Sequence, residues 1–393
     1  NIIGNVPHLR FPEFSGEWNK YTINDLATVV GGGTPDTTVK SYWGGDIQWF
    51  TPSEIGKNKY VDFSKRTITR DGLDNSSAKL LPLHTILLSS RATVGECSIA
   101  SNECTTNQGF QSLIAKQCNI DFLYYLIQTK KKDLIRNACG STFLEISANE
   151  IRKIKVAVPV QNEQEQIAKL LSLIDERIAT QNKIIEKLQS LIKGLVDELM
   201  TVLLKGKLYP FSSFYIKAGE GGTPTTSVVE YYTEGTIPFI KIEDLSCKYL
   251  TNNKDFITEL GMQKSSAWLI PSKSVIYSNG ATIGAISINE YPVCTKQGIL
   301  GIVPNTNINV EYLYLLMSSS YFSKEISRII TEGTMKTAYL KDINHIKCPL
   351  PSMAQQKNIT NLTSSIEEKL SIEQELLRFL NLQKQYLLHM IFI

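Results

Sequence analysis

The chain has 393 residues, of which 42% are hydrophobic, and its 41 basic and 38 acidic residues give a formal net charge of +3. This length suits two or three domains with real hydrophobic cores. The near balance of charge is unlike a self-sufficient DNA-binding protein, which carries a stronger basic excess. If the chain binds DNA, we therefore expect other subunits to supply much of the contact with phosphates.

The sequence shows no stretch of 18 apolar residues and no basic-then-apolar leader segment. This pattern predicts a soluble, cytoplasmic protein without membrane contact. The seven cysteines include no CxxC pair and the four histidines lie far apart, which predicts a reduced protein without a disulfide framework or a zinc site. Because the sequence begins with Asn1, we expect a few residues to precede it.

Taken in chain order, the sequence is a duplication with an offset of about 190 residues. Short blocks of the first half recur in the same order in the second half. The clearest are Gly-Gly-Thr-Pro at 32–35 and 221–224, Ala-Thr-x-Gly at 92–95 and 281–284, and x-Gln-Gly at 107–109 and 296–298. The chain is therefore two copies of one module, each a globular part followed by a long helix.

Each globular part is expected to be α+β. Short β-rich runs at 47–50, 85–89 and 275–278 indicate strands between Gly, Asn and Ser turns. The stretches 120–138 and 310–330 have helical spacing. The predicted boundaries are 1–158 for the first domain, 159–206 for the first long helix, 207–350 for the second domain and 351–393 for the second long helix.

The stretch 163–205 predicts one long helix. Apolar residues recur in steps of four and three from Ile167 to Val202, interrupted only by Gln181, which is the heptad period of a coiled coil. A poorer version of this seam runs from Ile359 to the C-terminus. The two helices are expected to pack antiparallel, giving two tandem domains with approximate two-fold symmetry. A helix of this length spans ~60 Å, enough to set the distance between two DNA half-sites one helical turn apart.

Motifs for catalysis are missing. The sequence has no Pro-Pro, so it lacks the Asn/Asp-Pro-Pro-aromatic motif of adenine methyltransferases, and no Gly-Lys-Ser/Thr follows the glycines at 31–33. It also lacks a nucleophile elbow and an HExxH zinc motif. We therefore expect a non-catalytic chain with no cofactor or metal of its own.

The remaining chemistry is recognition. Arg91 is suited to guanine and Asn279 to adenine, and a basic stretch with interleaved aromatic residues follows at 57–70. Each position can also be explained without DNA contact, because the Ala-Thr-x-Gly blocks can be plain turns and isolated lysines are usually only solvated. The candidate DNA-binding residues are Lys57, Lys59, Lys65, Arg66, Arg70, Ser90, Arg91, Thr93, Asn107, Gln108, Lys241, Lys248, Lys264, Ser278, Asn279, Thr282, Lys296 and Gln297.

The sequence resembles that of the specificity subunit of type I restriction-modification systems. The resemblance covers essentially the whole chain and rests on the Gly-Gly-Thr-Pro and Ala-Thr-x-Gly blocks and on Pro-x-x-x-Glu-Gln at the start of the long helix. The second helix departs from this pattern, since Gln355-Gln356 stands in place of Glu-Gln. The resemblance implies two target recognition domains, each reading one half of a bipartite, asymmetric double-stranded DNA sequence.

The resemblance also implies two methyltransferase (M) subunits, which use S-adenosylmethionine, and endonuclease (R) subunits, which use ATP and Mg. The helices would dock the M subunits through outward faces. The candidate partner-binding residues are Gln164, Asp175, Arg177, Lys183, Gln356, Glu367 and Lys369. Two alternatives stay open: a two-headed scaffold that bridges proteins without touching DNA, and a recognition subunit of a different phage-defence methyltransferase. A stand-alone enzyme is disfavoured by the missing motifs.

Overall fold

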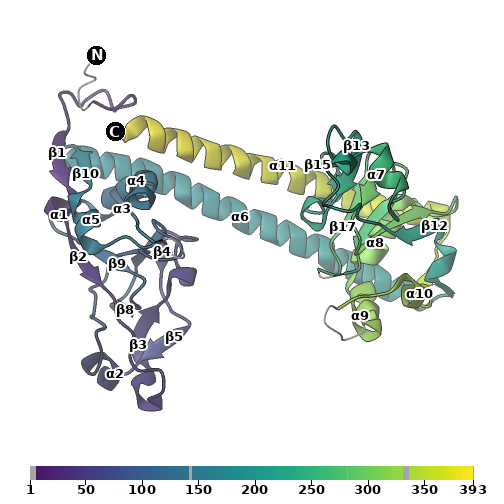
Figure 1. The fold of residues 1–393 in the computed structure, drawn as a ribbon, viewed down its shortest axis with the longest axis horizontal. Coiled ribbons are helices and arrows are strands. Elements are labelled where there is room, and N and C mark those ends of the chain that lie inside the picture. Colours follow the sequence, from purple (N-terminus) through teal and green to yellow (C-terminus); the bar gives the residue numbers. More distant parts are fainter. Residues whose placement is uncertain (1–5, 141–143, 281, 331–335, 393) are drawn as a thin grey trace. The chain divides into compact units, whose positions relative to one another are not determined.

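The computed structural model describes residues 6–140, 144–280, 282–330 and 336–392, so Ala281 of the second Ala-Thr-x-Gly block lies outside the described residues. The chain divides into two compact units, residues 1–183 with 375–393 and residues 184–374. Each unit contains mixed sheets, short helices and parts of two long helices, which confirms the α+β prediction (Figure 1). We call residues 6–158 the first domain and residues 207–350 the second domain.

The first domain carries the shorter elements of the first unit. Its helices are α1 (Ile23–Leu26), α2 (Arg70–Asp74), α3 (Ile120–Thr129), α4 (Lys131–Arg136) and α5 (Ala148–Lys153). Its strands are β1 (Asn19–Thr22), β2 (Ala27–Gly31), β3 (Trp43–Phe50), β4 (Tyr60–Val61), β5 (Arg66–Ile68), β6 (Ile86–Leu88), β7 (Cys97–Ala100), β8 (Cys104–Thr106), β9 (Gln111–Ala115) and β10 (Lys155–Val158).

The second domain repeats this series. Its helices are α7 (Glu259–Gln263), α8 (Val310–Ser318), α9 (Ser320–Ile329) and α10 (Leu340–Ile343). Its strands are β11 (Leu208–Pro210), β12 (Tyr215–Glu220), β13 (Ile237–Ile240), β14 (Tyr249–Leu250), β15 (Asp255–Ile257), β16 (Val275–Ser278), β17 (Ile286–Asn289), β18 (Cys294–Thr295), β19 (Ile299–Pro304) and β20 (Lys347–Pro349).

The two domains have the same topology. A five-stranded sheet has the order β2-β9-β6-β7-β4 in the first domain and β12-β19-β16-β17-β14 in the second. A three-stranded sheet has the order β5-β3-β8 in the first and β15-β13-β18 in the second. In each domain the first strand pairs antiparallel with the last strand before a long helix, as β1 with β10 and β11 with β20. The duplication seen in the sequence is therefore a duplication of fold.

The stretches expected to be helical over 120–138 and 310–330 are each two helices. The first breaks at Lys130, whose ψ of 7° leaves the helical region. The second breaks at Ser319, which has extended dihedrals and whose side chain accepts a hydrogen bond from the Phe322 N–H. A serine at this position caps the new helix and ends the old one, because its hydroxyl satisfies an N–H group without an intrahelical partner.

The long helices are α6 (Gln161–Leu203) and α11 (Met353–Ile391). In the first unit they pack antiparallel, since Ile167 lies beside Ile391 and Asp175 contacts Lys384. Among the described residues, no helix is both long and apolar enough to cross a bilayer.

The predicted apolar seam is buried at Ile167, Leu171 and Ile174 but not at its far end, where Val202 is 61% exposed. Val196 and Met200 are buried there instead. These two side chains belong to the core of the second domain, so the last turns of α6 pack against that domain. A heptad repeat cannot anticipate this change of face, because it assumes that the partner is always another helix.

Candidate nucleic-acid interface

The Gly-Gly-Thr-Pro loops are sites of close backbone approach. A Cβ atom on Gly32 would lie 2.0 Å from the Asn107 carbonyl oxygen, and one on Gly221 would lie 2.1 Å from the Thr295 carbonyl oxygen. The next glycine in each loop is also tightly packed: a Cβ atom on Gly33 would lie 2.3 Å from the Ser77 carbonyl carbon, and one on Gly222 would lie 2.5 Å from the Ala267 backbone nitrogen. No side chain fits at these positions, which explains why both copies carry glycine.

Three loops of the first domain meet at the end of β6. The Ser90 N–H donates to the Gly109 carbonyl at 2.8 Å, and the Ile146 N–H donates to the Ser90 carbonyl at 2.9 Å. Arg91 forms an ion pair with Glu145 at 2.7 Å. Gln108 is hydrogen-bonded to Thr34, so the Gly-Gly-Thr-Pro loop joins the same cluster.

The second domain repeats the cluster at the end of β16. The Asn279 N–H donates to the Gly298 carbonyl at 3.0 Å, and the Ala338 N–H donates to the Asn279 carbonyl at 2.9 Å. Gly95 and Gly284 close equivalent turns with φ of +89° and +103°, a conformation that favours glycine. The repeated sequence blocks are thus brought together in each unit, and we call each gathering a loop cluster.

Three of the candidate DNA-binding residues are buried in these clusters. Ser90, Ser278 and Asn279 are fully inaccessible to solvent. The Asn279 side chain donates to the Ala338 carbonyl at 3.1 Å, so its amide joins two segments of the domain. The structure therefore does not present these candidate DNA-binding side chains at the surface. The three residues lie at the ends of buried strands, where their backbone groups join neighbouring segments. The Ser90 and Ser278 hydroxyls and the Asn279 side-chain oxygen are buried without a hydrogen-bond partner among the described residues.

The other candidates in the loop clusters reach the surface. Thr93, Gln108, Thr282, Lys296 and Gln297 are exposed, and Arg91 is partly exposed while paired with Glu145. Asn107 is half-buried, with its side-chain oxygen accepting from the Gly109 N–H at 2.9 Å. The accessible polar groups of these clusters are therefore amides, hydroxyls and cations, which are the groups that read base edges.

The basic stretch of the first domain is exposed at Lys57, Lys65, Arg66 and Arg70. Arg66 lies over the Trp43 ring, with its guanidinium carbon 3.6 Å from the ring centroid. Trp43 contacts Trp49 edge-to-face, and the Trp49 indole N–H donates to the Gly33 carbonyl at 2.9 Å. Arg66 is thus linked through two tryptophans to the Gly-Gly-Thr-Pro loop.

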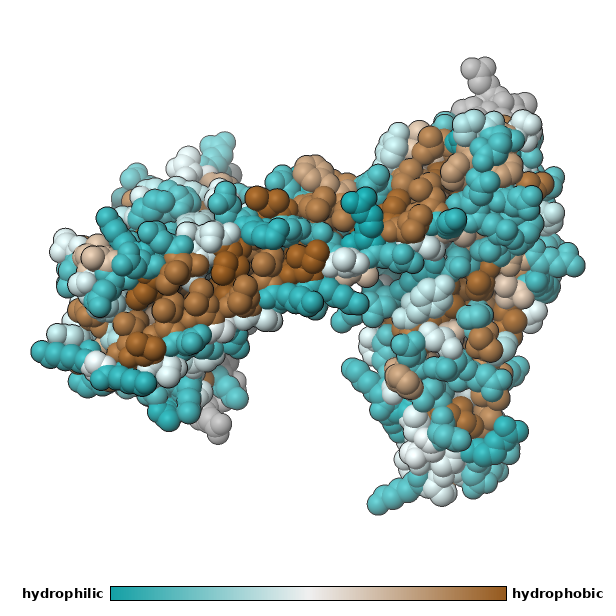
Figure 2. Space-filling view, turned by 180° about the vertical axis from the view of Figure 1, so that it is seen from behind, coloured by the Kyte–Doolittle hydropathy of each residue, from teal (hydrophilic) through white to brown (hydrophobic). Residues whose placement is uncertain are grey.

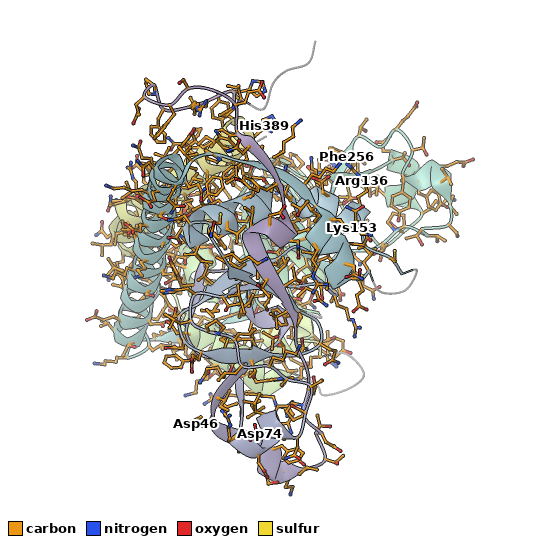
Figure 3. All side chains as sticks on the ribbon, turned by 90° about the vertical axis from the view of Figure 1, so that its left-hand side faces the viewer. Asp46, Asp74, Arg136, Lys153, Phe256 and His389 are labelled. Atoms are coloured by element: carbon orange, nitrogen blue, oxygen red, sulfur yellow. The ribbon has the colours of Figure 1, made fainter. Side chains whose placement is uncertain are left out.

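Acidic residues lie close to this basic stretch. Arg70 forms an ion pair with Asp74, and Asp46 and Asp74 lie at the same end of the first domain (Figure 3). In the second domain Lys264 is exposed, whereas Lys241 pairs with Asp255 at 2.9 Å. The hydrogen bond to Asp255 raises the pKa of the Lys241 ammonium group. The mixture of signs agrees with the small net charge of the chain.

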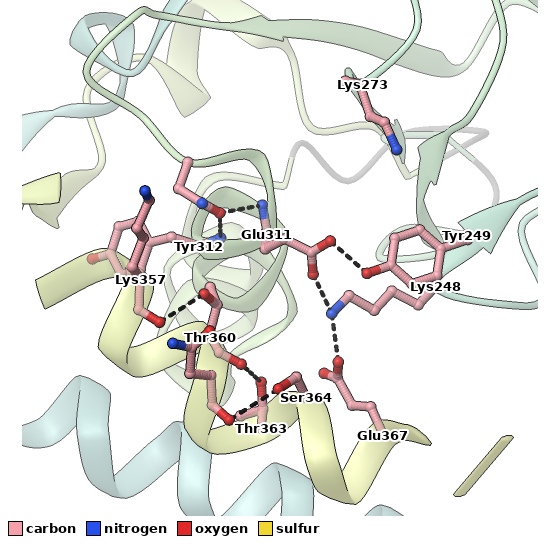
Figure 4. Close-up of polar contacts among 12 residues, drawn as sticks. Lys248, Tyr249, Lys273, Glu311, Tyr312, Lys357, Thr360, Thr363, Ser364 and Glu367 are labelled. Carbon is pink, nitrogen blue, oxygen red and sulfur yellow. Dashed lines mark hydrogen bonds and ion pairs between the residues drawn. The ribbon is translucent and has the colours of Figure 1, made fainter. Parts of the chain in front are cut away.

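Two predicted lysines have internal partners. Lys59 contacts Asp121 at 2.7 Å and the Ser172 hydroxyl of α6 at 2.7 Å. Lys248 contacts Glu311 of α8 and, at 2.5 Å, Glu367 of α11 (Figure 4). Their side chains are only 10% and 14% exposed, so the structure does not present them as free basic groups.

A profile of the type I restriction modification DNA specificity domain matches residues 15–190 and 214–381. The chain belongs to this family. It is 29% identical over 382 residues to the MjaIX specificity subunit of Methanocaldococcus jannaschii, covering 90% of this chain and 88% of the relative. It is also 29% identical over 175 residues to the EcoR124I/EcoR124II specificity subunit of Escherichia coli, covering 42% of this chain and 43% of that one.

Solved structures of the family support the fold. A specificity subunit from M. genitalium aligns over 99% of both chains with a TM-score of 0.55 and 18% sequence identity. A chain from a structure describing assembly and conformational transition of the type I system aligns over 96% of this chain and 97% of its own, with a TM-score of 0.58 and 13% identity. The tandem arrangement of two domains and long helices is therefore the family fold.

Some of the residues expected on the outward faces of the long helices are inward. Gln164 is 5% exposed and Gln356 is fully buried, so the prediction that these glutamines face outward is wrong. Asp175 pairs with Lys384 at 2.7 Å, and Glu367 pairs with Lys248. The physical reason is that each long helix contacts a domain as well as the other helix, which leaves fewer outward positions than a free coiled coil has.

The remaining three candidates do face solvent. Arg177 and Lys183 are exposed on α6, and Lys369 is exposed on α11 beside Glu373. Arg177 lies at the rim of a groove between α6 and α11 in the first unit. We call this the apolar groove; its apolar residues are Leu170, Leu173, Ile174, Leu376, Leu380 and Leu387.

The apolar groove was missed by sequence reasoning. Leu173 is 51% exposed and Leu376 is 41% exposed, although both are leucines on long helices. Figure 2 shows apolar surface along these helices. The signal in the sequence is a second set of apolar residues off the heptad seam, such as Ile372, Leu376 and Phe379 on α11. Exposed apolar surface of this kind marks a contact site.

Among the described residues, no group of three or more His, Cys, Asp or Glu side chains is arranged to hold a metal ion. The buried thiols are also unsuited to reaction. Burial raises the pKa of Cys97, Cys104 and Cys118 to about 12, which keeps them protonated at neutral pH.

Proposed function

We propose that this chain is the DNA sequence-specificity subunit of a type I restriction-modification complex in the cytoplasm. Each domain reads one half of a bipartite, asymmetric DNA target. The chain itself is non-catalytic. Methylation of adenine N6 with S-adenosylmethionine is carried out by two M subunits, and ATP- and Mg-dependent cleavage by R subunits.

One observation carries the proposal: the two domains have the same scaffold but different residues at equivalent positions. Arg91 of the first loop cluster corresponds to Gly280, and Asn107 corresponds to Lys296. Arg66, which lies over the Trp43 ring, corresponds to Asp255, which pairs with Lys241. Because base pairs differ in their donor and acceptor patterns, two such surfaces select different short sequences. This supports an asymmetric split target rather than a palindrome.

We propose that the long helices set the gap between the half-sites. Both α6 and α11 contribute residues to both units and contain no interior proline. Stiff helices of ~1.5 Å rise per residue have a length suited to half-sites spaced by a DNA turn of ~34 Å. Lengthening both helices by whole turns is expected to widen the gap without altering either half-site.

The apolar groove is the proposed docking site for an M subunit in the first unit. Leucines from both helices line it, and Glu176, Arg177 and Gln383 surround them with polar groups. An apolar centre with a polar rim is the usual composition of a protein interface. The near-neutral chain would then share the phosphate contacts with its partners, which must hold the duplex while a base is flipped for methylation.

The experiment is to co-express the chain with its methyltransferase partner and to map N6-methyladenine across a test genome. The expected result is methylation confined to a split motif of two unrelated half-sites at a fixed gap. Methylation that is absent, or that is identical without this chain, would overturn the proposal and favour a scaffold that bridges proteins. Methylation of a defined split motif by a complex that lacks R subunits would still support the specificity function.

A further inference from the structure

Two lysines occupy equivalent places in the two units. Lys59 and Lys248 are 189 positions apart, and each directly precedes a short strand, β4 or β14, at the edge of the five-stranded sheet. Each ammonium group lies against tyrosine rings, with Lys59 4.8 Å from the Tyr125 ring centroid and Lys248 5.4 Å from that of Tyr314. These positions are too enclosed for an ordinary surface lysine.

In the second unit, Lys248 joins the domain to α11. Its ammonium contacts Glu311 in the first turn of α8 and Glu367 of α11 at 2.5 Å (Figure 4). The Tyr249 hydroxyl also donates to Glu311. Burial and the hydrogen bond to this carboxylate raise the pKa of Tyr249, so the hydroxyl stays protonated. We call these four residues the second lysine cluster.

In the first unit, Lys59 joins the domain to α6. It contacts Asp121 in the first turn of α3 at 2.7 Å and the Ser172 hydroxyl at 2.7 Å. The Tyr60 hydroxyl donates to Asp121 at 2.8 Å, as Tyr249 does to Glu311. We call these four residues the first lysine cluster.

Asp175, the equivalent of Glu367, extends the first lysine cluster to α11. Its carboxylate accepts from the Tyr125 hydroxyl at 2.7 Å and pairs with Lys384 of α11 at 2.7 Å. The same design therefore recurs in both units: a lysine at a sheet edge, an acid at the start of a domain helix, and a polar partner on a long helix.

Such clusters favour one orientation more than they add stability. A largely buried ion pair gains little net free energy, because desolvation of the charges offsets their attraction. If the domain rotates on the helix, however, the lysine keeps only the acid of its own domain and loses its partner on the long helix while its charge remains shielded from water, which is costly. The surrounding apolar contacts lack this directionality, since burial depends on area and not on angle.

We propose that Lys59 and Lys248 are positioning residues that fix the orientation of each domain on its long helix, and thereby the gap at which the two half-sites are accepted. This inference rests on the proposed function. It assigns these lysines to gap selectivity and not to DNA contact. Half-site sequence would be left to the loop clusters and Arg66.

The test measures methylation by the intact methyltransferase complex on duplexes carrying both half-sites. The gap is set at the genomic value, one base pair shorter, or one base pair longer. Lys59→Met and Lys248→Met remove the charge and keep the apolar stem. Matched controls are Lys153→Met and Lys273→Met, which break exposed ion pairs with Glu150 and Glu290 in the same two units.

We expect each cluster variant to lower the preference for the genomic gap by about tenfold, equivalent to ~1.4 kcal/mol. The half-site sequences should not change, and the controls should retain the wild-type gap preference. If Lys248→Met fails to fold, Glu367→Gln replaces it, because this variant weakens only the helix side of the second lysine cluster.

Two outcomes separate the inference from the proposed function. Cluster variants that lose methylation equally at all three gaps, or that keep the wild-type preference, would overturn the positioning role. If the wild-type complex methylates no split site at all, the proposed function itself fails. A shifted half-site sequence in Lys248→Met would also overturn the inference, since it would mean that Lys248 contacts DNA.

Discussion

Gln164 and Gln356, which lie 192 positions apart, make the same two hydrogen bonds in the two units. The Gln164 side-chain oxygen accepts from the Asn119 N–H at 3.0 Å, and that of Gln356 accepts from the Asn309 N–H at 2.7 Å. Each side-chain nitrogen donates at 2.9 Å to the proline carbonyl that precedes its own helix, Pro159 or Pro351. Each glutamine therefore joins the start of a long helix to the cap of a domain helix.

Replacing either glutamine should destabilise the unit that contains it. Gln164→Leu or Gln356→Leu leaves a buried N–H and a carbonyl without their partner, which costs about 1–3 kcal/mol per group. We expect the free energy of unfolding, measured by urea denaturation of the full chain, to fall by about 2 kcal/mol or more. Gln385→Leu, at an exposed position of α11, is the control and should change it by less than about 0.5 kcal/mol. Equal effects of all three changes would contradict the anchoring role.

Two glycine-to-alanine substitutions should change stability in opposite directions, because one glycine allows close packing of the backbone and the other lies in an open helix interior. Gly33→Ala would place a Cβ 2.3 Å from backbone carbon of Ser77, whereas a Cβ on Gly194 of α6 meets nothing within 4 Å. We expect Gly33→Ala to lower the free energy of unfolding by about 3 kcal/mol through overpacking. Gly194→Ala should raise it by up to about 1 kcal/mol, because alanine favours a helix interior. The measurement is the melting temperature of each variant compared with wild type. An unchanged melting temperature for Gly33→Ala would contradict the close backbone approach described for this loop.

The fold could be predicted from the sequence because each of its sequence motifs occurs in both halves of the chain. The predicted strands at 47–50, 85–89 and 275–278 lie within or around β3, β6 and β16. The long helices begin at Gln161 and Met353, two residues after the predicted boundaries at 159 and 351. The duplication supplied a second copy of each motif, so a weak pattern in one half was supported by the other. Local periodicity was sufficient for these elements, because burial of one face determines the spacing of apolar residues.

The candidate site was harder to predict from the sequence, because the burial of a side chain depends on tertiary structure. Asn279 and Gln108 are both amides next to a repeated glycine block, yet Asn279 is fully buried and Gln108 is exposed. Lys248 and Lys264 are both isolated lysines of the second domain, yet only Lys248 meets two carboxylates. Residue type and spacing could not distinguish these cases, since the partners Glu311 and Glu367 lie far along the chain.

A charge in the apolar groove should weaken binding of the methyltransferase partner. Leu173→Glu and Leu376→Glu each place a carboxylate among leucines that would be buried in the complex. We expect a loss of affinity of about thirtyfold, the ~2 kcal/mol typical of an interface hot spot. Binding is measured by titrating the partner onto the purified chain, with Gln385→Glu as an exposed control on α11. Retained affinity in the leucine variants, with an unchanged melting temperature, would move the docking site elsewhere on the chain.

Arg66 should read a base of the half-site bound by the first domain. Its guanidinium is held on Trp43 before any ligand binds, so little conformational entropy is lost on contact, and a bidentate contact to guanine is worth about 1–3 kcal/mol. Arg66→Ala is expected to relax selectivity at one position of that half-site and to lower methylation of the cognate site by about tenfold or more. Trp43→Ala should act in the same direction, because it removes the surface that orients the guanidinium.

The measurement for Arg66 is the methylated motif of the reconstituted complex, together with DNA affinity at several salt concentrations. Lys153→Ala removes one positive charge from the same unit and serves as the control (Figure 3). A phosphate contact would behave differently from a base contact. It would weaken binding uniformly across sequences and reduce the salt dependence by about one ion, leaving the motif intact. That pattern in Arg66→Ala would assign Arg66 to the DNA backbone and leave base recognition in the first domain to Arg91 and Gln108.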